Sequence, residues 1–139
     1  KQLSQTLAIQ TSGRHFYDVT QKVLDWAEQS NFKEGLLTLY VQHTSASLLI
    51  NENYDPDVLV DLESFFERLV PDGDPLFIHT AEGQDDMPAH IRTALTQTSL
   101  SIPIKEGKVA LGQWQGIFLC EFDGPRTRQV HVQWVGKQN

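Results

Sequence analysis

His43 belongs to the first of three groups of residues whose types and spacing could do chemistry. It ends an apolar segment, and the hydroxyl groups of Thr44, Ser45 and Ser47 follow directly. Functional side chains often gather at strand ends, where a rigid sheet fixes the side chain and the next loop leaves room for a ligand. The ordinary alternative is a strand-end histidine bonded to the backbone, with hydroxyls that make turn hydrogen bonds. Residue types alone leave both interpretations open.

The second group places two histidines and three carboxylates within a dozen residues. Its members are His79, Glu82, Asp85, Asp86 and His90. Imidazole and carboxylate are the usual ligands of catalytic zinc and of related divalent metals, and a divalent metal, zinc or magnesium, is the expected cofactor. His43, His79 and His90 could together complete a three-histidine metal site. The spacing lacks the i, i+4 histidine pair of the His-Glu-x-x-His motif. The alternative is that Asp85 and Asp86 cap a helix while both histidines are exposed.

The third group combines an aromatic turn with two arginines. Trp114 and Gln115 lie between glycines, a pattern typical of close backbone approach or of a bulge. Arg126 and Arg128 are two residues apart on an expected strand, so they should share a face and could grip a phosphate bidentately. The alternative is a hairpin whose arginines form exposed ion pairs with acidic residues.

Composition excludes several classes of protein. The chain has 139 residues with a net charge of −7 and no basic run, which argues against nucleic-acid binding. No apolar stretch approaches the roughly 18 residues of a membrane helix, and Lys1–Gln5 lacks the apolar segment of a secretory signal. The lone Cys120 indicates a reducing compartment, so we expect a cytoplasmic protein with one domain over residues 1–139.

Elements that position these residues can be predicted from periodicity. The first half of the chain predicts a half-buried strand at 3–11, followed by a helix that is capped by Asp18 and ends by Asn31. A central strand at 36–43, buried on both faces, and a strand at 46–50 come next. A second helix then starts with Asp55 as cap and Pro56 as first residue.

A long acidic loop is expected at 71–87, and loops of that length in a compact domain are usually functional or disordered. The remainder predicts a short helix at 88–96 and strands at 100–104, 117–122 and 130–134. The fold class is therefore α+β, with mixed or antiparallel sheets and two to three packed helices.

Three signatures in this sequence resemble those of the YjbQ-like family. They are His43-Thr44-Ser45-Ala46-Ser47-Leu48-x-Ile50-Asn51-Glu52-Asn53, Asp85-Asp86-x-Pro88-x-His90, and Gly112-x-Trp114-Gln115-x-Ile117-x-Leu119-x-Glu121 followed by Gly124 to Arg128. The resemblance covers essentially the whole chain. It implies an α+β subunit that assembles as a homotrimer, with a site lined by the signature residues. Members are often labelled secondary thiamine-phosphate synthases.

The resemblance and the residues together give an expected function. We expect a metal-assisted enzyme acting on a small phosphorylated substrate, with thiamine-phosphate synthase activity as the particular reaction, since a divalent metal and arginines can neutralise a departing pyrophosphate. The expected metal ligands are His43, His79 and His90; the phosphate-binding residues are Arg126, Arg128, Trp114 and Gln115; the catalytic residues are Thr44, Ser45, Glu52 and Asp85. Glu52 or Asp85 would serve as general base or orient a histidine.

Two other functions fit the same residues. A metal-assisted phosphoester hydrolase would use the same parts as a transferase. A trimeric module that binds or senses a small molecule without catalysis is the alternative from another class.

Overall fold

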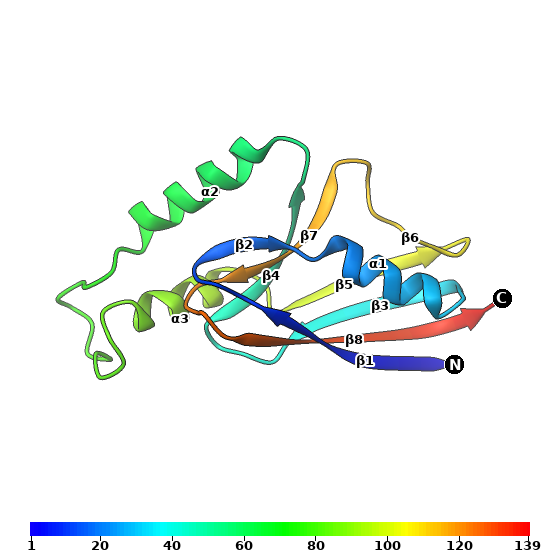
Figure 1. The fold of residues 1–139 in the computed structure, drawn as a ribbon, viewed down its shortest axis with the longest axis horizontal. Coiled ribbons are helices and arrows are strands. Elements are labelled where there is room, and N and C mark those ends of the chain that lie inside the picture. Colours follow the sequence, from blue (N-terminus) through cyan, green and yellow to red (C-terminus); the bar gives the residue numbers. More distant parts are fainter.

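The three longest strands belong to a five-stranded antiparallel sheet in the order β1-β8-β3-β5-β6 (Figure 1). The computed structural model describes residues 1–139. The strands of this sheet are β1 (Gln2–Gln10), β3 (Phe32–Val41), β5 (Ser99–Lys105), β6 (Lys108–Val109) and β8 (Thr127–Gln138). Trp134 on β8 is fully buried and stacks on Phe32 with ring centroids 4.2 Å apart.

A second, three-stranded antiparallel sheet has the order β2-β7-β4. Its strands are β2 (His15–Asp18), β4 (Ala46–Glu52) and β7 (Gln115–Glu121). Ala46 pairs with Glu121 and Glu52 pairs with Gln115, so the two ends of this sheet are about 20 Å apart at 3.3–3.4 Å per residue. That separation decides below which predicted residues can share a site.

Three helices complete the fold, namely α1 (Thr20–Gln29), α2 (Pro56–Leu69) and α3 (Asp86–Leu95). Asp55 caps α2, with Pro56 at its first position, as predicted: its carboxylate accepts a hydrogen bond from the backbone N–H of Asp57 at 2.9 Å. The N-cap position of α1 is Val19 and not the predicted Asp18, although the Asp18 carboxylate accepts a 2.9 Å hydrogen bond from the backbone N–H of Thr20. None of the helices is long and apolar enough to cross a membrane.

The three-stranded sheet lies between the larger sheet and two of the helices. Its residues Leu48 and Leu119 are buried in the main core, with Leu37 and Leu39 of the larger sheet. On its other face Phe118 and other buried residues form a second core, against which α2 packs. Burial on both faces explains why almost every side chain of β7 is inside the protein. The predicted α+β class with antiparallel sheets is confirmed.

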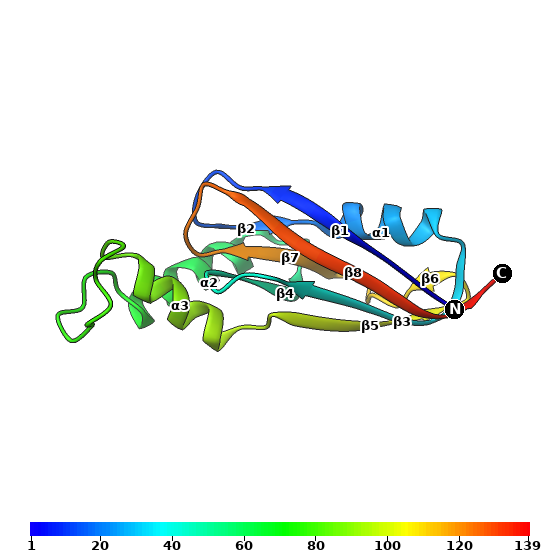
Figure 2. The same ribbon diagram turned by 90° about the horizontal axis from the view of Figure 1, so that it is seen from below.

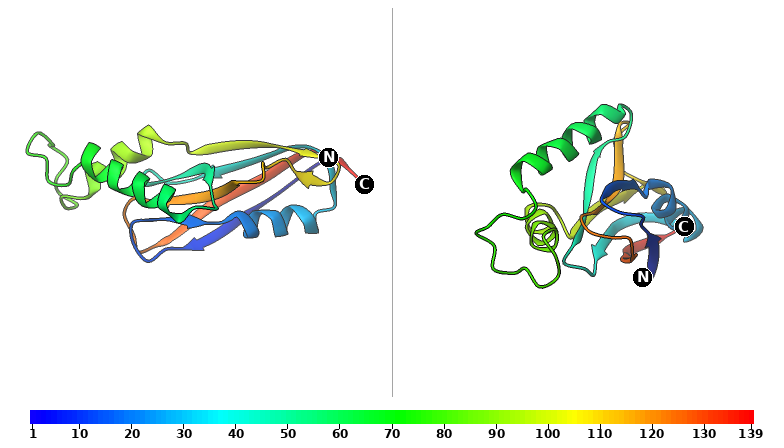
Figure 3. Two further views of the ribbon diagram at one scale, coloured as in Figure 1. Left: turned by 90° about the horizontal axis from the view of Figure 1, so that it is seen from above. Right: turned by 60° about the vertical axis from the view of Figure 1, so that its left-hand side comes forward.

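The strands run along the long axis of the molecule, and the two ends differ (Figures 2 and 3). The loop at 70–85, the N-terminus of α3, the 42–45 connection and the 122–126 turn lie at one end, while both chain termini lie at the other (Figure 1). The first end therefore gathers most of the polar residues singled out above.

The central strand is buried on one face only, which corrects the prediction of burial on both. Leu36 and Tyr40 on β3 are 45% and 48% exposed, whereas Leu37, Leu39 and Val41 are buried. The nearly continuous apolar pattern came from outward-facing apolar side chains. Val135 pairs with Leu36 and is also exposed, so the larger sheet presents apolar groups to solvent.

Candidate metal centre

His79, Asp86 and His90 form a cluster at the polar end of the molecule, hereafter the metal-site cluster. One carboxylate oxygen of Asp86, Oδ2, lies 2.7 Å from His79 Nε2 and 3.0 Å from His90 Nε2. One potential ligand atom from each residue lies within 4.8 Å of the others. The Asp86 side chain is largely buried, whereas the histidine side chains remain 41% and 33% exposed. The carboxylate of the cluster is thus buried, and its two imidazoles are accessible to solvent.

Helix α3 and the preceding loop position these residues. Asp86 and His90 are four residues apart on α3, so their side chains lie on the same helix face. His79 comes from the loop, which turns back at Gly83, whose φ of +106° favours glycine. The turn is closed by a 3.2 Å hydrogen bond from the backbone N–H of Gly83 to the carbonyl of Thr80.

The orientation of His90 places its Nε2 against a carboxylate oxygen, which a neutral ring in this orientation could not bind as a hydrogen-bond donor. Its Nδ1 lies 3.0 Å from the Thr44 carbonyl oxygen, which can only accept, so Nδ1 carries a proton. In a neutral imidazole Nε2 then holds a lone pair, which faces the carboxylate oxygen of Asp86 at 3.0 Å. Two acceptors at that distance repel each other unless a proton or a cation lies between or beside them. Metal-ligating histidines commonly hold their second nitrogen in this way.

A further carboxylate and an arginine lie beside the cluster. The hydrogen bond from His79 lowers the pKa of Asp86, although burial opposes it. Burial raises the pKa of Asp123, and the nearby carboxylates of Asp85 and Asp86 add to the rise while Arg126 opposes it. Arg126 donates to Asp123 Oδ2 at 2.9 Å and its side chain is 47% exposed. The arginine therefore presents an open positive charge next to a group of acids.

His43 does not belong to the metal-site cluster, where Asp86 takes the third position. Its Nε2 accepts a 2.8 Å hydrogen bond from the backbone N–H of Gln129. Burial lowers the pKa of His43, and the charge of Arg128 lowers it further, which agrees with a neutral ring that accepts. His43, Thr44 and His90 line one open groove. Metal ligation by His43 stays a prediction. Within this subunit, His43 and the cluster residue His90 line the same groove.

Arg128 and Ser45 are buried, contrary to the expectation of an exposed arginine pair. The Arg128 side chain is 1% exposed and its Nε donates to Glu121 Oε1 at 2.8 Å, while its Nη2 also pairs with Glu121. The same Nη2 donates to Ser45 Oγ at 2.8 Å. Thr11 donates to Glu121 Oε1 at 2.6 Å. We call these four residues the buried arginine network; its hydrogen bonds occupy both Arg128 and Ser45.

Glu52, Trp114 and Gln115 lie at the opposite end of the three-stranded sheet from the cluster. Glu52 and Gln115 are paired on β4 and β7. The exposed Trp114 ring packs against Tyr54 with centroids 4.7 Å apart. Within one subunit these residues form a second polar group, at the far end of a sheet that is about 20 Å long.

Asp86 and Asp123 are the residues that sequence reasoning did not assign to the site. The signal in the sequence is the i, i+4 spacing of Asp86 and His90, but the helix predicted at 88–96 does not include Asp86. The helix begins at Asp86, which puts both side chains on one face. Asp123 carried no comparable signal, since its place beside Asp86 depends on the packing of the 122–126 turn against α3.

Sequence comparison assigns the chain to a family. The family model described as "UPF0047 protein YjbQ-like" matches residues 5–137. The chain belongs to the YjbQ-like family. UPF0047 protein sll1880 of Synechocystis is 48% identical over 138 residues, covering 99% of this chain and 94% of that protein. UPF0047 protein YjbQ of Escherichia coli O157:H7 is 46% identical, covering 84% of each chain.

Solved structures of YjbQ-like and related proteins share the fold. The hypothetical protein APE1520 of Aeropyrum pernix superposes with a TM-score of 0.90 at 32% identity, covering 97% of this chain and 99% of that one. The YjbQ/UPF0047 protein of Clostridium acetobutylicum gives 0.86 at 36% identity, covering 94% and 99%. The resemblance in the signatures is thus confirmed at the level of family and fold. The names of these relatives give no reaction.

Proposed function

We propose that the metal-site cluster binds a divalent metal ion and that the protein is a metal-assisted enzyme acting on a small phosphorylated substrate. The observation that carries the proposal is the convergence of one ligand atom each from His79, Asp86 and His90 within 4.8 Å of one another, where a divalent cation would take the place of the protons that the ring nitrogens share with the carboxylate. Two imidazoles and a carboxylate are the donor set of several catalytic zinc sites. The exposed histidine rim leaves room for water or substrate.

The surroundings of the cluster support a phosphorylated substrate. A divalent ion bound there would neutralise negative charge that develops on phosphate oxygens. Arg126 supplies an exposed guanidinium nearby, and its planar fork matches a phosphate. Thr44, whose carbonyl orients His90, keeps an exposed side chain that can donate a hydrogen bond to the substrate. Asp85, next to Asp86 at the start of α3, can act as general base or orient a ligand.

Thiamine-phosphate synthesis is the particular reaction suggested by the label of some members of the family. It joins a pyrimidine diphosphate to a thiazole phosphate and releases pyrophosphate, a charge that the metal and Arg126 would neutralise. Hydrolysis of a phosphoester would use the same groups. These two reactions form the candidate list for assay.

A homotrimer in a reducing, cytoplasmic environment is the proposed working state. Exposed apolar residues on the larger sheet, among them Leu36, Tyr40 and Val135, favour burial by another subunit. Assembly could also bring Glu52 and Trp114 of one subunit near the metal-site cluster of another. Light scattering at micromolar concentration should return the trimer mass, and a monomer mass would contradict this state.

The deciding experiment combines metal binding with substrate screening. The purified protein is stripped with chelator and titrated with Zn²⁺, Mn²⁺ and Mg²⁺ by calorimetry. It is then screened for turnover of phosphorylated metabolites, including the two thiamine precursors, with and without the metal. Stoichiometric binding with metal-dependent turnover is expected. Binding without turnover would favour the non-catalytic module, and no binding in wild type would remove the proposal.

A further inference from the structure

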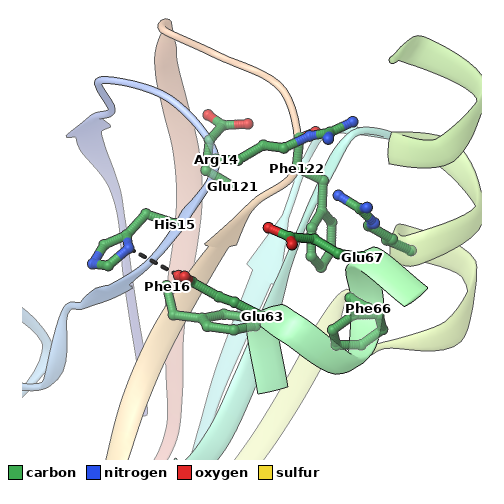
Figure 4. A pocket seen from close by; sticks show the side chains of 9 residues that line it. Arg14, His15, Phe16, Glu63, Phe66, Glu67, Glu121 and Phe122 are labelled. Atoms are coloured by element: carbon green, nitrogen blue, oxygen red, sulfur yellow. Dashed lines mark hydrogen bonds and ion pairs between the residues drawn. The ribbon is translucent and has the colours of Figure 1, made fainter. Parts of the chain in front are cut away.

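A second pocket lies on the opposite side of α3 from the metal-site cluster, and we call it the phenylalanine pocket. It is a small, partly open pocket lined by residues of β2, α2, α3 and the end of β7 (Figure 4). Arg92 is two residues after His90, about 200° around the helix, since 3.6 residues complete a turn. The pocket therefore shares a helix with the cluster but none of its side chains.

Arg92 is the unusual member of the lining. It is 4% exposed, and its Nη2 donates to the carbonyl oxygen of Val70 at 3.0 Å. Its Nε has no hydrogen-bond partner, and no carboxylate lies within ion-pair distance. A buried charge without a counter-ion is costly, and such groups in proteins are normally paired. Burial lowers the pKa of Arg92, and the charge of Arg14 lowers it further.

The other charged groups of the pocket are already engaged, with one exception. Arg14 forms a bidentate pair with Asp72 at 2.8 and 3.0 Å. Glu63 lies 2.9 Å from His15 Nδ1, and Glu121 belongs to the buried arginine network. Glu67 is exposed and has no ion-pair partner, and its carboxylate points into the space between Arg14 and the phenylalanines (Figure 4). Arg92 is thus the positively charged side chain of the pocket without an ion-pair partner, and Glu67 is the negatively charged one.

Phenylalanine rings supply the apolar part of the lining. Phe16 and Phe66 lie on the side opposite Arg14, and Phe122 lines the pocket between them (Figure 4). Apolar aromatic walls with one or two fixed polar groups are typical of small-molecule pockets. Three lining carboxylates oppose a dianion such as phosphate. A single negative charge on a planar group suits the fork of an arginine better.

We propose that the phenylalanine pocket binds a small monocarboxylate with an aromatic or short apolar body, its carboxylate on Arg92 and its body against the phenylalanines. The ligand's carboxylate supplies the counter-charge that Arg92 lacks. This site is independent of the metal proposal, because its side chains are different and its test needs no metal.

Benzoate is the probe, and benzamide, which has the same shape without the charge, is the matched ligand control. Amide chemical shifts are followed by NMR with chelator present in every sample. Benzoate should shift residues around the pocket, and benzamide should bind at least about tenfold more weakly, since a hydrogen bond to a charged group is lost. Equal binding of the two probes, or no shift at millimolar benzoate, would overturn the proposal.

Variants test the role of Arg92 directly. Arg92→Met should weaken benzoate binding at least about tenfold, whereas Arg68→Met, an exposed arginine of α2, should leave it unchanged. Glu67→Gln provides a second test that does not depend on the folding of the Arg92 variant. It removes the negative charge of Glu67, which acts on Arg92 without forming an ion pair and would repel a bound carboxylate, so benzoate affinity should rise. Unchanged or weaker affinity in Glu67→Gln would contradict the placement of the carboxylate.

Discussion

The metal-site cluster and the buried arginine network both bring charged side chains together. They differ in how deeply the side chains are buried and in how completely their polar atoms are hydrogen-bonded. Arg128 and Glu121 are at most 1% exposed, and their polar atoms are bound to each other, to Thr11 and to Ser45. In the metal-site cluster, by contrast, two half-exposed imidazoles lie within hydrogen-bond distance of one carboxylate oxygen.

This difference separates a structural cluster from a site. A buried, satisfied ion pair holds neighbouring segments together and leaves no atom for a ligand. Here it ties β8 to β7 and to the 42–45 connection. Hydrogen bonds from Arg128 and Thr11 hold the pKa of Glu121 below its ordinary value even though burial would raise it. An open, incompletely satisfied cluster has atoms available for a ligand. Mutations can test whether the two clusters have these different roles.

The largest expected effect is on stability, in Arg128→Met. Removing one partner leaves Glu121 as an uncompensated buried charge, which should cost about 3–5 kcal/mol of unfolding free energy. Urea denaturation measures it. The matched control is Arg126→Met, whose exposed pair with Asp123 should contribute about 0–1 kcal/mol. Equal losses of unfolding free energy in the two variants would mean that the buried network stabilises the fold no more than the exposed pair does.

The next effect is on metal affinity, in His90→Gln. Replacement of a ligand should weaken divalent metal binding at least about 100-fold, because changes to outer partners alone cost 10–100-fold. Unfolding free energy of the metal-free protein should change little, as the ring is partly exposed. His131→Gln, on the larger sheet, serves as control. Calorimetric titration with Zn²⁺ checks the result, and undiminished affinity in His90→Gln would place the metal elsewhere.

A smaller effect is expected on phosphate binding, in Arg126→Lys. Lysine keeps the charge but loses the bidentate fork, so pyrophosphate should bind about tenfold more weakly in the presence of metal. Arg128→Lys should lose stability instead, with binding by the folded fraction unchanged, because the Arg128 side chain is only 1% exposed. Titration calorimetry and thermal melting of both variants separate the two roles. Weaker pyrophosphate binding in Arg128→Lys alone would reverse our assignment.

The sequence predicted elements well where local rules decide them. Asp55 and Pro56 gave the start of α2, and the alternation at 3–11 gave β1 to within one residue at each end. The four-residue strand β2 was missed, because His15–Asp18 is too short and too polar to show alternation. The outward face of β3 was missed for the opposite reason, since Leu36 and Tyr40 are apolar but exposed. Periodicity reports residue type, and exposure depends on what packs nearby.

The site was predictable in part for the same physical reason. His79 and His90 are close in sequence, and a loop followed by a helix start brings them together. The burial of Arg128 was not predictable, because it depends on Glu121 and Ser45 arriving from two other segments. Separation of Glu52 from the histidines follows from the register of β4 on β7, which no local pattern specifies.

The smallest expected effect is a pH dependence of stability carried by His43, at the boundary between the two clusters. Burial and the charge of Arg128 lower its pKa below the ordinary 6.5. As pH falls through that ordinary value, the unfolded chain takes up a proton at His43 that the folded protein does not. Stability is therefore fully present above pH 6.5 and declines as the solution is acidified towards the lower folded pKa.

His43→Gln tests this contribution, because glutamine can still accept the hydrogen bond from Gln129 but does not titrate. Urea unfolding from about pH 8 to about pH 5 should show a shallower decline in the variant than in the wild type, and His131→Gln should retain the wild-type decline. An identical slope in His43→Gln would mean that His43 is protonated as readily in the folded protein as in the unfolded chain. The buried arginine network would then exert no electrostatic influence on the groove that His43 shares with His90.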